Sequence, residues 1–197
     1  MEKPKGLIFY CHANDGALDY WGTLGEYFNN LGYDIVMMDY AGYGKSDPKL
    51  TTEKRLFGDI QLLYDTMKTL YSEDQIVVYG RSMGTGIASS LLVNNSPKML
   101  ILETPYYNLK KLVRFYAIAP VPVFFVRWNL ANNEHILSSG IPVYIFSGTA
   151  DEIIPHQQSI DLANLRDGVE LYAIENGKHS DLDKFPEFHR GLGEVLD

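Results

Sequence analysis

Cysteine is almost absent from this 197-residue chain, since Cys11 is the only one, and no disulfide can form within it. We expect Cys11, inside the apolar run GLIFYC, to be a small buried hydrophobic residue rather than a nucleophile. A long hydrophobic run is also missing. The longest apolar stretch, FYAIAPVPVFFV at 115–126, is too short to cross a bilayer and is interrupted by proline. These absences exclude an internal disulfide and a transmembrane segment.

The chain has fewer basic than acidic residues. The chain has 17 Lys and Arg against 25 Asp and Glu, which gives a formal net charge of −8 at pH 7. A polyanion would be repelled, so nucleic acid is not an expected partner. The start, MEKPKGLIFYC, holds too short an apolar run for a signal peptide. We therefore expect a soluble, cytoplasmic protein with one domain over 1–197, because 46% hydrophobic residues suffice for one core at this length.

Short apolar runs alternate with longer amphipathic stretches along the chain. Near-continuous apolarity at strand length predicts strands that are buried on both faces, as in a parallel sheet. Between them, 51–71 has apolar residues at helical spacing and Thr52 as a candidate N-cap. The alternation predicts an α/β fold with right-handed crossovers. The six predicted strands are GLIFYC (6–11), YDIVMMDY (33–40), QIVVYG (75–80), KMLILE (98–103), IPVYIFSG (141–148) and VELYAIE (169–175).

One segment between predicted strands is unusually long. Residues 104–140 are rich in aromatic side chains and show no clean helical period. A long insertion in a compact domain is often a functional lid. An ordinary helical excursion packed on the core is the alternative, and both interpretations stay open.

The stretch YGRSMGTG (79–86) places Ser82 between Gly80 and Gly84, after an apolar run and before the helix-like GTGIASSLLVNN. A sharp strand-to-helix turn forces such a serine into a strained backbone conformation, and bulk at the flanking glycines would clash. The N-terminus of the following helix directs its amides at the site. The pattern predicts that Ser82 is a nucleophile, and an inert serine in a glycine-rich turn is the alternative.

A serine hydroxyl needs a base, and the base needs an orienting carboxylate. In folds with this turn the chain order is Ser, then Asp or Glu, then His. Asp151 follows the strand predicted at 141–148, and His179 follows the last one. The carboxyl ends of parallel strands meet at one edge, where active sites assemble, so Asp151 and His179 are the predicted partners of Ser82. Glu152 and Asp181 are weaker candidates for the acid.

An oxyanion hole needs two backbone amides aimed at the developing charge. We assign one to Met83, the residue after the nucleophile, and the other to Asn14 in the loop CHANDG after the first strand. His12 in that loop is predicted to brace it rather than to act as a base. The three other histidines are predicted to be surface residues: His135, His156 and His189.

The stretches IFYCHANDG, DYAGYGKSD, YGRSMGTG, LETPYYNL, SGTADEIIP and NGKHSDL resemble, in this order, the signature stretches of the α/β-hydrolase superfamily. The likeness is greatest to small abhydrolase-domain depalmitoylases and to the catalytic domains of prolyl-oligopeptidase-like enzymes, and it covers nearly the whole chain. The resemblance implies the nucleophile at Ser82, the acid at Asp151 and the base at His179. It implies oxyanion amides at Met83 and Asn14.

The chain departs from the family pattern in two ways that bear on structure. The usual His-Gly of the oxyanion loop is His12-Ala13 here. The family also has two strands before the first one predicted here, so the resemblance implies a mostly parallel six-stranded sheet in the order 2-1-3-4-5-6. Its edge at 33–40 is apolar, and an open edge invites pairing. Either the chain is part of a longer one, or a homodimer covers this edge.

We therefore expect a serine hydrolase that cleaves carboxylic esters or thioesters through an acyl-enzyme on Ser82, without a metal or cofactor. A serine peptidase of prolyl-oligopeptidase type, or a non-catalytic binding module on a hydrolase scaffold, are the alternatives. Aromatic residues in and before the insertion are candidates for an acyl pocket. Core packing is the other explanation for each of them: Tyr106, Tyr107, Phe115, Phe124, Phe125 and Trp128.

Overall fold

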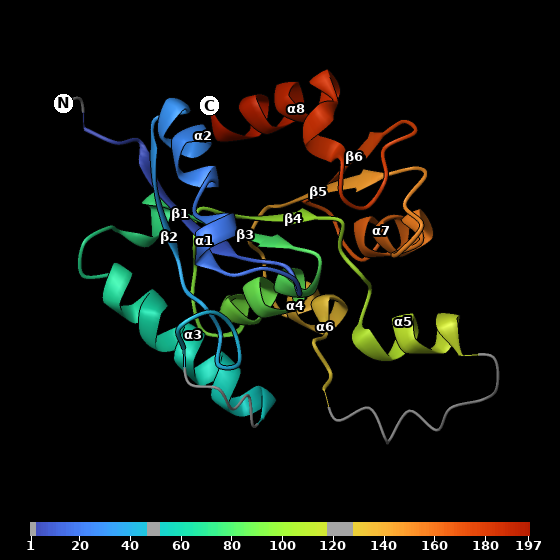
Figure 1. The fold of residues 1–197 in the computed structure, drawn as a ribbon, viewed down its shortest axis with the longest axis horizontal. Helices are drawn as coiled ribbons and strands as arrows, with labels where there is room; N and C mark the ends of the chain where they lie inside the picture. Colours follow the sequence, from blue (N-terminus) through green and yellow to red (C-terminus); the bar gives the residue numbers. More distant parts are fainter. Residues whose placement is uncertain (1–2, 47–51, 118–127) are drawn as a thin grey trace.

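The computed structural model describes residues 3–46, 52–117 and 128–197. Six parallel strands form one sheet in the order β2-β1-β3-β4-β5-β6 (Figure 1). The fold class and strand order predicted from the sequence are confirmed. The strands are β1 (Gly6–Cys11), β2 (Tyr33–Met37), β3 (Ile76–Arg81), β4 (Met99–Glu103), β5 (Val143–Gly148) and β6 (Val169–Ile174).

Helices cover both faces of the sheet (Figure 1). Two hydrophobic clusters, one on each face, join these helices to alternate side chains of the strands. One face carries α1 (Leu18–Trp21), α2 (Leu24–Asn30) and α8 (Pro186–Leu196). The other carries α3 (Glu53–Met67), α4 (Met83–Ser90), α6 (Asn132–Leu137) and α7 (His156–Ala163). Single 3₁₀ turns lie at Glu73–Gln75, Leu91–Val93 and Leu182–Lys184.

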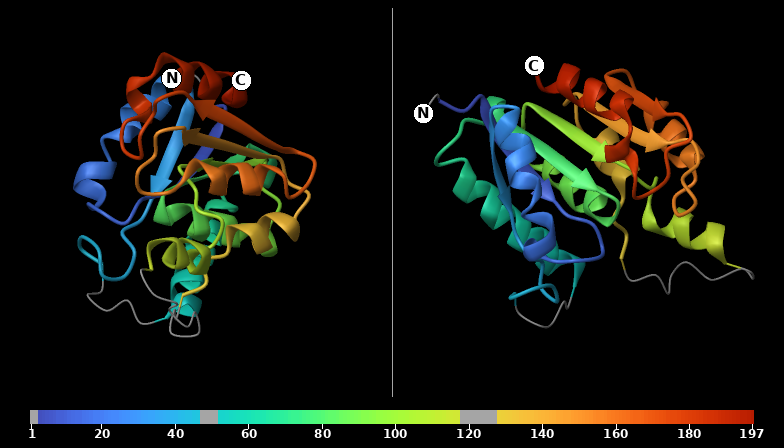
Figure 2. Two further views of the ribbon diagram at one scale, coloured as in Figure 1. Left: turned by 90° about the vertical axis from the view of Figure 1, so that its right-hand side faces the viewer. Right: turned by 45° about the horizontal axis from the view of Figure 1, so that its top comes forward.

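Burial differs between the centre and the edges of the sheet. The strands β1, β4 and β5 are almost wholly buried, as predicted for parallel strands covered on both faces. The edge strands β2 and β6 are half-exposed. Figure 2 shows the twist of the sheet between these two edges. The predicted pairing of two copies through 33–40 stays a prediction.

Helix α3 follows the predicted pattern closely. The Thr52 side chain accepts a hydrogen bond from the Arg55 N–H at 3.1 Å, which satisfies one of the free amides at the helix start. Leu56, Ile60 and Tyr64 form its buried face. The helix thus packs by the apolar spacing that predicted it.

The described part of the insertion at 104–140 contains two short helices, where the sequence showed no clean helical period. Helix α5 (Leu109–Tyr116) is capped by Asn108, whose side chain accepts from the Lys111 N–H at 2.8 Å. Helix α6 packs against α4. Elements of eight and six residues are too short to establish a period in the sequence. Among the residues described, no helix is long and apolar enough to cross a membrane.

Candidate active site

Ser82 joins β3 to α4 in a conformation that is rare for residues with side chains, with φ 50° and ψ −117°. The neighbouring glycines allow this turn. A Cβ on Gly80 would lie 2.6 Å from the Gly84 carbonyl oxygen, and one on Gly84 would lie 2.1 Å from that of Cys11. The backbone therefore approaches itself at both positions too closely for any side chain.

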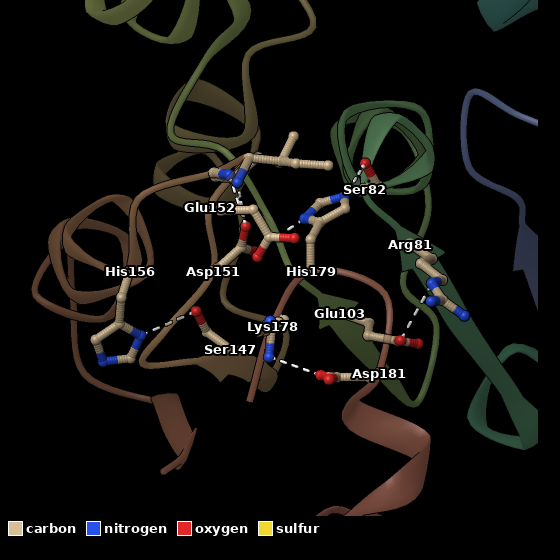
Figure 3. Close-up of polar contacts among 12 residues, drawn as sticks. Arg81, Ser82, Glu103, Ser147, Asp151, Glu152, His156, Lys178, His179 and Asp181 are labelled. Carbon is tan, nitrogen blue, oxygen red and sulfur yellow. Dashed lines mark hydrogen bonds and ion pairs between the residues drawn. The ribbon is translucent and has the colours of Figure 1, made fainter. Parts of the chain in front are cut away.

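The structure brings Ser82, His179 and Asp151 together, although they are far apart in the sequence (Figure 3). The His179 Nε2 atom lies 2.9 Å from Ser82 Oγ, and its Nδ1 atom lies 2.9 Å from Asp151 Oδ2. The Asp151 side chain is fully buried and that of His179 is 10% exposed. The three residues follow β3, β6 and β5, so the carboxyl ends of these strands assemble them.

The Asp151 carboxylate is held from its second side as well. Its Oδ1 atom accepts from the backbone N–H groups of Ile153 at 2.8 Å and Ile154 at 2.7 Å. The two weaker candidates for the acid make no hydrogen bond to His179 among the described contacts. Glu152 is exposed, and Asp181 accepts from the Lys178 N–H at 2.7 Å, within the loop that carries His179.

The residues predicted to supply oxyanion amides lie beside Ser82. Met83 is the first residue of α4, where a backbone N–H has no partner within the helix. Asn14 and Met83 both border the cavity next to Ser82. His12 is buried, its Nδ1 donates to the Ala13 carbonyl at 2.8 Å, and its ring stacks on Tyr40. These contacts agree with a bracing role for His12, and burial lowers its pKa.

A cavity of about 640 Å³ opens beside Ser82 and His179. A few polar side chains border it: Asn14, Asp15, Arg81 and Ser180. Most of its wall is apolar or aromatic: Tyr20, Trp21, Tyr40, Tyr43, Leu56, Met83, Tyr106, Leu109, Leu112, Trp128, Leu130, Ile153 and Ile154. Its size and lining are typical of a site for a small, largely apolar ligand.

Only part of the predicted acyl pocket borders this cavity. Tyr106 and Trp128 line it. Tyr107 packs against the core next to it, and Phe115 is 62% exposed, so neither forms the wall. The remaining two predicted residues lie outside the described ranges: Phe124 and Phe125.

The prediction of surface positions holds only in part for two histidines, whose side chains are half-buried. His135 Nδ1 lies 2.9 Å from Ser89 Oγ, and His156 Nδ1 lies 2.9 Å from Ser147 Oγ. Partial burial lowers the pKa of both, because α6 and α7 hold these side chains against α4 and β5. His189 is exposed, as predicted.

The thiol at Cys11 is buried, as predicted, and its burial raises its pKa to about 12. Such a thiol is not a nucleophile near neutral pH. Within the described ranges, no group of three His, Cys, Asp or Glu side chains could hold a metal ion.

Sequence reasoning missed two polar contacts that build the site. Arg81 Nε lies 3.2 Å from Glu103 Oε1, beneath the turn at Ser82 (Figure 3). The register of β3 on β4 places these two residues opposite each other, a pairing that the strand order alone does not give. The Glu53 carboxylate accepts from the N–H groups of Asn129 and Leu130, the latter at 2.7 Å. Glu53 thereby holds one wall of the cavity against α3.

Comparisons with known proteins show which sequences and folds this chain resembles. A family model described as "Serine aminopeptidase, S33" matches residues 2–136. The lysophosphatidylserine lipase ABHD12 of Macaca fascicularis is 26% identical over 98% of this chain and 52% of its own length. The human α/β hydrolase domain-containing protein 17B is 28% identical over 98% of this chain and 66% of its own length. The chain thus spans about half the length of the first curated relatives it matches.

A solved structure with the same fold is the Pyrococcus furiosus esterase Pf2001. Its TM-score to this chain is 0.76 at 21% sequence identity, and the match covers 98% of this chain and 83% of the esterase. The likeness extends over the whole sheet and its helices.

Proposed function

The chain belongs to the serine aminopeptidase S33 family, and from this premise we propose that it is a serine hydrolase that cleaves carboxylic esters or thioesters through an acyl-enzyme on Ser82. The observation that carries the proposal is the position of His179 within 2.9 Å of both Ser82 Oγ and Asp151 Oδ2. The names of an ABHD12 lipase and of a Pyrococcus esterase, similar to this chain in sequence and fold respectively, support the same class of reaction.

In the first half of the proposed reaction, His179 Nε2 takes the proton from Ser82 as Oγ attacks the acyl carbonyl carbon. The Asp151 carboxylate accepts a hydrogen bond from His179 Nδ1–H, which keeps Nε2 free and stabilises the imidazolium. The backbone amides of Met83 and Asn14 donate to the oxyanion of the tetrahedral intermediate. The intermediate then collapses, and the alcohol or thiol departs with the proton from His179.

In the second half, water replaces the departed alcohol or thiol. His179 removes a proton from the water, whose oxygen attacks the acyl carbon of the ester on Ser82. A second tetrahedral intermediate forms against the same two amides. Its collapse returns the proton to Ser82 Oγ and releases the carboxylic acid, so the enzyme is regenerated.

The cavity favours an acyl substrate over a peptide with a free amino terminus. Its wall beside Ser82 is formed by aliphatic side chains, such as Leu109 and Leu112 of the insertion, which suit an acyl chain. An aminopeptidase needs carboxylates to bind the substrate ammonium group, and among the described lining residues only Asp15 is acidic. We propose that the described residues of the insertion at 104–140 act as a lid over the acyl group, because Leu109 and Leu112 line the cavity.

The alternative of a binding module without catalysis is weakened by the strain at Ser82. A positive φ at a residue with a side chain costs about 1–3 kcal/mol and persists where the surrounding structure imposes it. A scaffold that only binds has no use for a serine held this way against a buried His–Asp pair.

The test is hydrolysis of p-nitrophenyl esters from acetate to dodecanoate, with aminoacyl p-nitroanilides measured in parallel. We expect turnover of the esters and little of the anilides. Ser82→Ala should reduce ester turnover to background. Ser90→Ala is the matched control, because this serine lies on the same helix and its hydroxyl donates to the Ile87 carbonyl. Preference for the anilides would favour the peptidase, and inactivity of the folded wild type on both series would favour the binding module.

A further inference from the structure

The loop after β2 holds the predicted oxyanion loop at three places. The Tyr40 hydroxyl donates to the His12 carbonyl at 3.1 Å, and Asp39 Oδ1 accepts from the Leu18 N–H at 2.9 Å. Between these two contacts, the Tyr43 hydroxyl donates to Asn14 Oδ1 at 2.8 Å. The segment that supplies the Asn14 amide is therefore tied down at its beginning, middle and end.

Tyr43 differs from the other two because it reaches both sides of the predicted oxyanion hole. Its hydroxyl also lies 3.8 Å from Met83 Sδ. Asn14 and Met83 come from different elements, the loop after β1 and the start of α4. One hydroxyl thus touches the side chains of both residues whose backbone amides are assigned to the oxyanion.

The ring of Tyr43 is itself held in place. It packs edge-on against His12 with centroids 5.3 Å apart, and edge-on against Tyr40 at 5.7 Å. These contacts leave the hydroxyl at the cavity wall, which Tyr43 helps to line. A fixed ring delivers its hydrogen bond at one position, so it can set the position of a loop.

We propose that Tyr43 is a positioning residue for the oxyanion hole, which sets the spacing of the Asn14 and Met83 amides through the side chains of those two residues. This inference rests on the proposed function of Ser82.

The expected effect is on the chemical step. Loss of one whole oxyanion donor lowers kcat by about 10²–10³-fold. Tyr43→Phe leaves both donor amides in place and removes only the restraint on their positions, so we expect a fall in kcat of about tenfold with KM nearly unchanged. Tyr27→Phe is the matched control, because it removes an exposed hydroxyl that pairs with His189, away from the cavity. It should leave both constants unchanged.

A double-mutant cycle tests whether Tyr43 acts through Asn14. Asn14→Ala keeps the backbone amide but removes the acceptor of the Tyr43 hydrogen bond. If the restraint passes through this bond, the double variant should lose about tenfold in kcat, as each single variant does. Independent losses that multiply to about a hundredfold would overturn the inference.

Amide hydrogen exchange provides a readout that does not depend on turnover. In Tyr43→Phe, the amides of 12–16 should exchange faster than in the wild type, and in Tyr27→Phe they should not. Unchanged exchange together with unchanged kcat would reject the role of Tyr43 while Ser82→Ala still abolishes activity. A folded wild type that neither hydrolyses esters nor reacts with a fluorophosphonate would overturn the proposed function and this inference together.

Discussion

Replacing Asp151 with asparagine separates the two tasks of this carboxylate. Oδ1 accepts two backbone N–H groups, from Ile153 and Ile154, and Oδ2 faces His179 Nδ1. In Asp151→Asn the amide oxygen must occupy the Oδ1 position, because an NH₂ group there would face the two backbone N–H donors. The NH₂ group then faces His179 Nδ1 and donates to it. The ring must carry its proton on Nε2, and this tautomer cannot accept the proton of Ser82.

The expected fall in kcat depends on which of its two orientations the new amide adopts. Turning it over would leave the N–H groups of Ile153 and Ile154 without this acceptor, and the part-buried one, at Ile154, would cost about 1–3 kcal/mol. The non-productive tautomer should therefore dominate. The same replacement in a protease triad lowers kcat by about 10⁴-fold, or about 5.4 kcal/mol at 1.36 kcal/mol per tenfold. The loop should stay folded, since both backbone bonds remain.

The assay is ester hydrolysis at saturating substrate, with a thermal melt of each variant. Asp181→Asn is the control, because Asp181 lies two residues from His179. Among the described residues its carboxylate accepts only the Lys178 N–H, and asparagine can keep that bond. We expect Asp181→Asn to retain kcat within about twofold. A kcat within tenfold of the wild type for folded Asp151→Asn would refute the role assigned to Asp151.

Three further predictions concern other parts of the molecule. Cys11, with its pKa raised to about 12 by burial, should resist a disulfide reagent at pH 8 in the native protein and react fully in urea. Glu53→Ala removes the acceptor of the Asn129 and Leu130 N–H groups, and it should lower the free energy of unfolding by about 1–3 kcal/mol for each amide left unpaired. Asp59→Ala on the same helix is the control and should change the free energy of unfolding by less than about 0.5 kcal/mol. Burial lowers the pKa of His135 below its ordinary value of 6.5. As the pH falls, the unfolded chain therefore protonates His135 before the folded protein does, and the free energy of unfolding decreases below about pH 6.5. His135→Gln should flatten that decline in urea titrations between pH 7.5 and 5, and an unchanged slope would contradict it.

Much of the fold was predictable because parallel strands buried on both faces are nearly continuous apolar runs. Each predicted strand contains or overlaps an observed one. The largest excess is at β2, which was expected to reach 40 but ends at Met37, where its last register partner is Tyr10 of β1. Beyond that point the chain turns, and Asp39 accepts from the backbone N–H groups of Leu18 in α1 and of Lys45 instead of continuing the strand. An apolar run predicts where a strand lies, but it does not show where the neighbouring strand stops pairing with it.

The site was predictable where a backbone constraint leaves a mark in the sequence. The glycines around Ser82 are such a mark, and so is the position of Asp151 and His179 directly after strands. The cavity wall was less predictable, because side chains reach it from separate loops. Tyr43 and Glu53 act through contacts with residues far away in the sequence, and nothing in their local pattern distinguishes them from surface residues.

The most direct test of Ser82 as the nucleophile is to react the protein with a fluorophosphonate probe and to locate the adduct by peptide mass spectrometry. We expect one adduct, on Ser82, whose formation slows sharply in His179→Ala and disappears in Ser82→Ala. An adduct on another residue, or none on the folded wild-type protein, would contradict the assignment of Ser82 as the nucleophile.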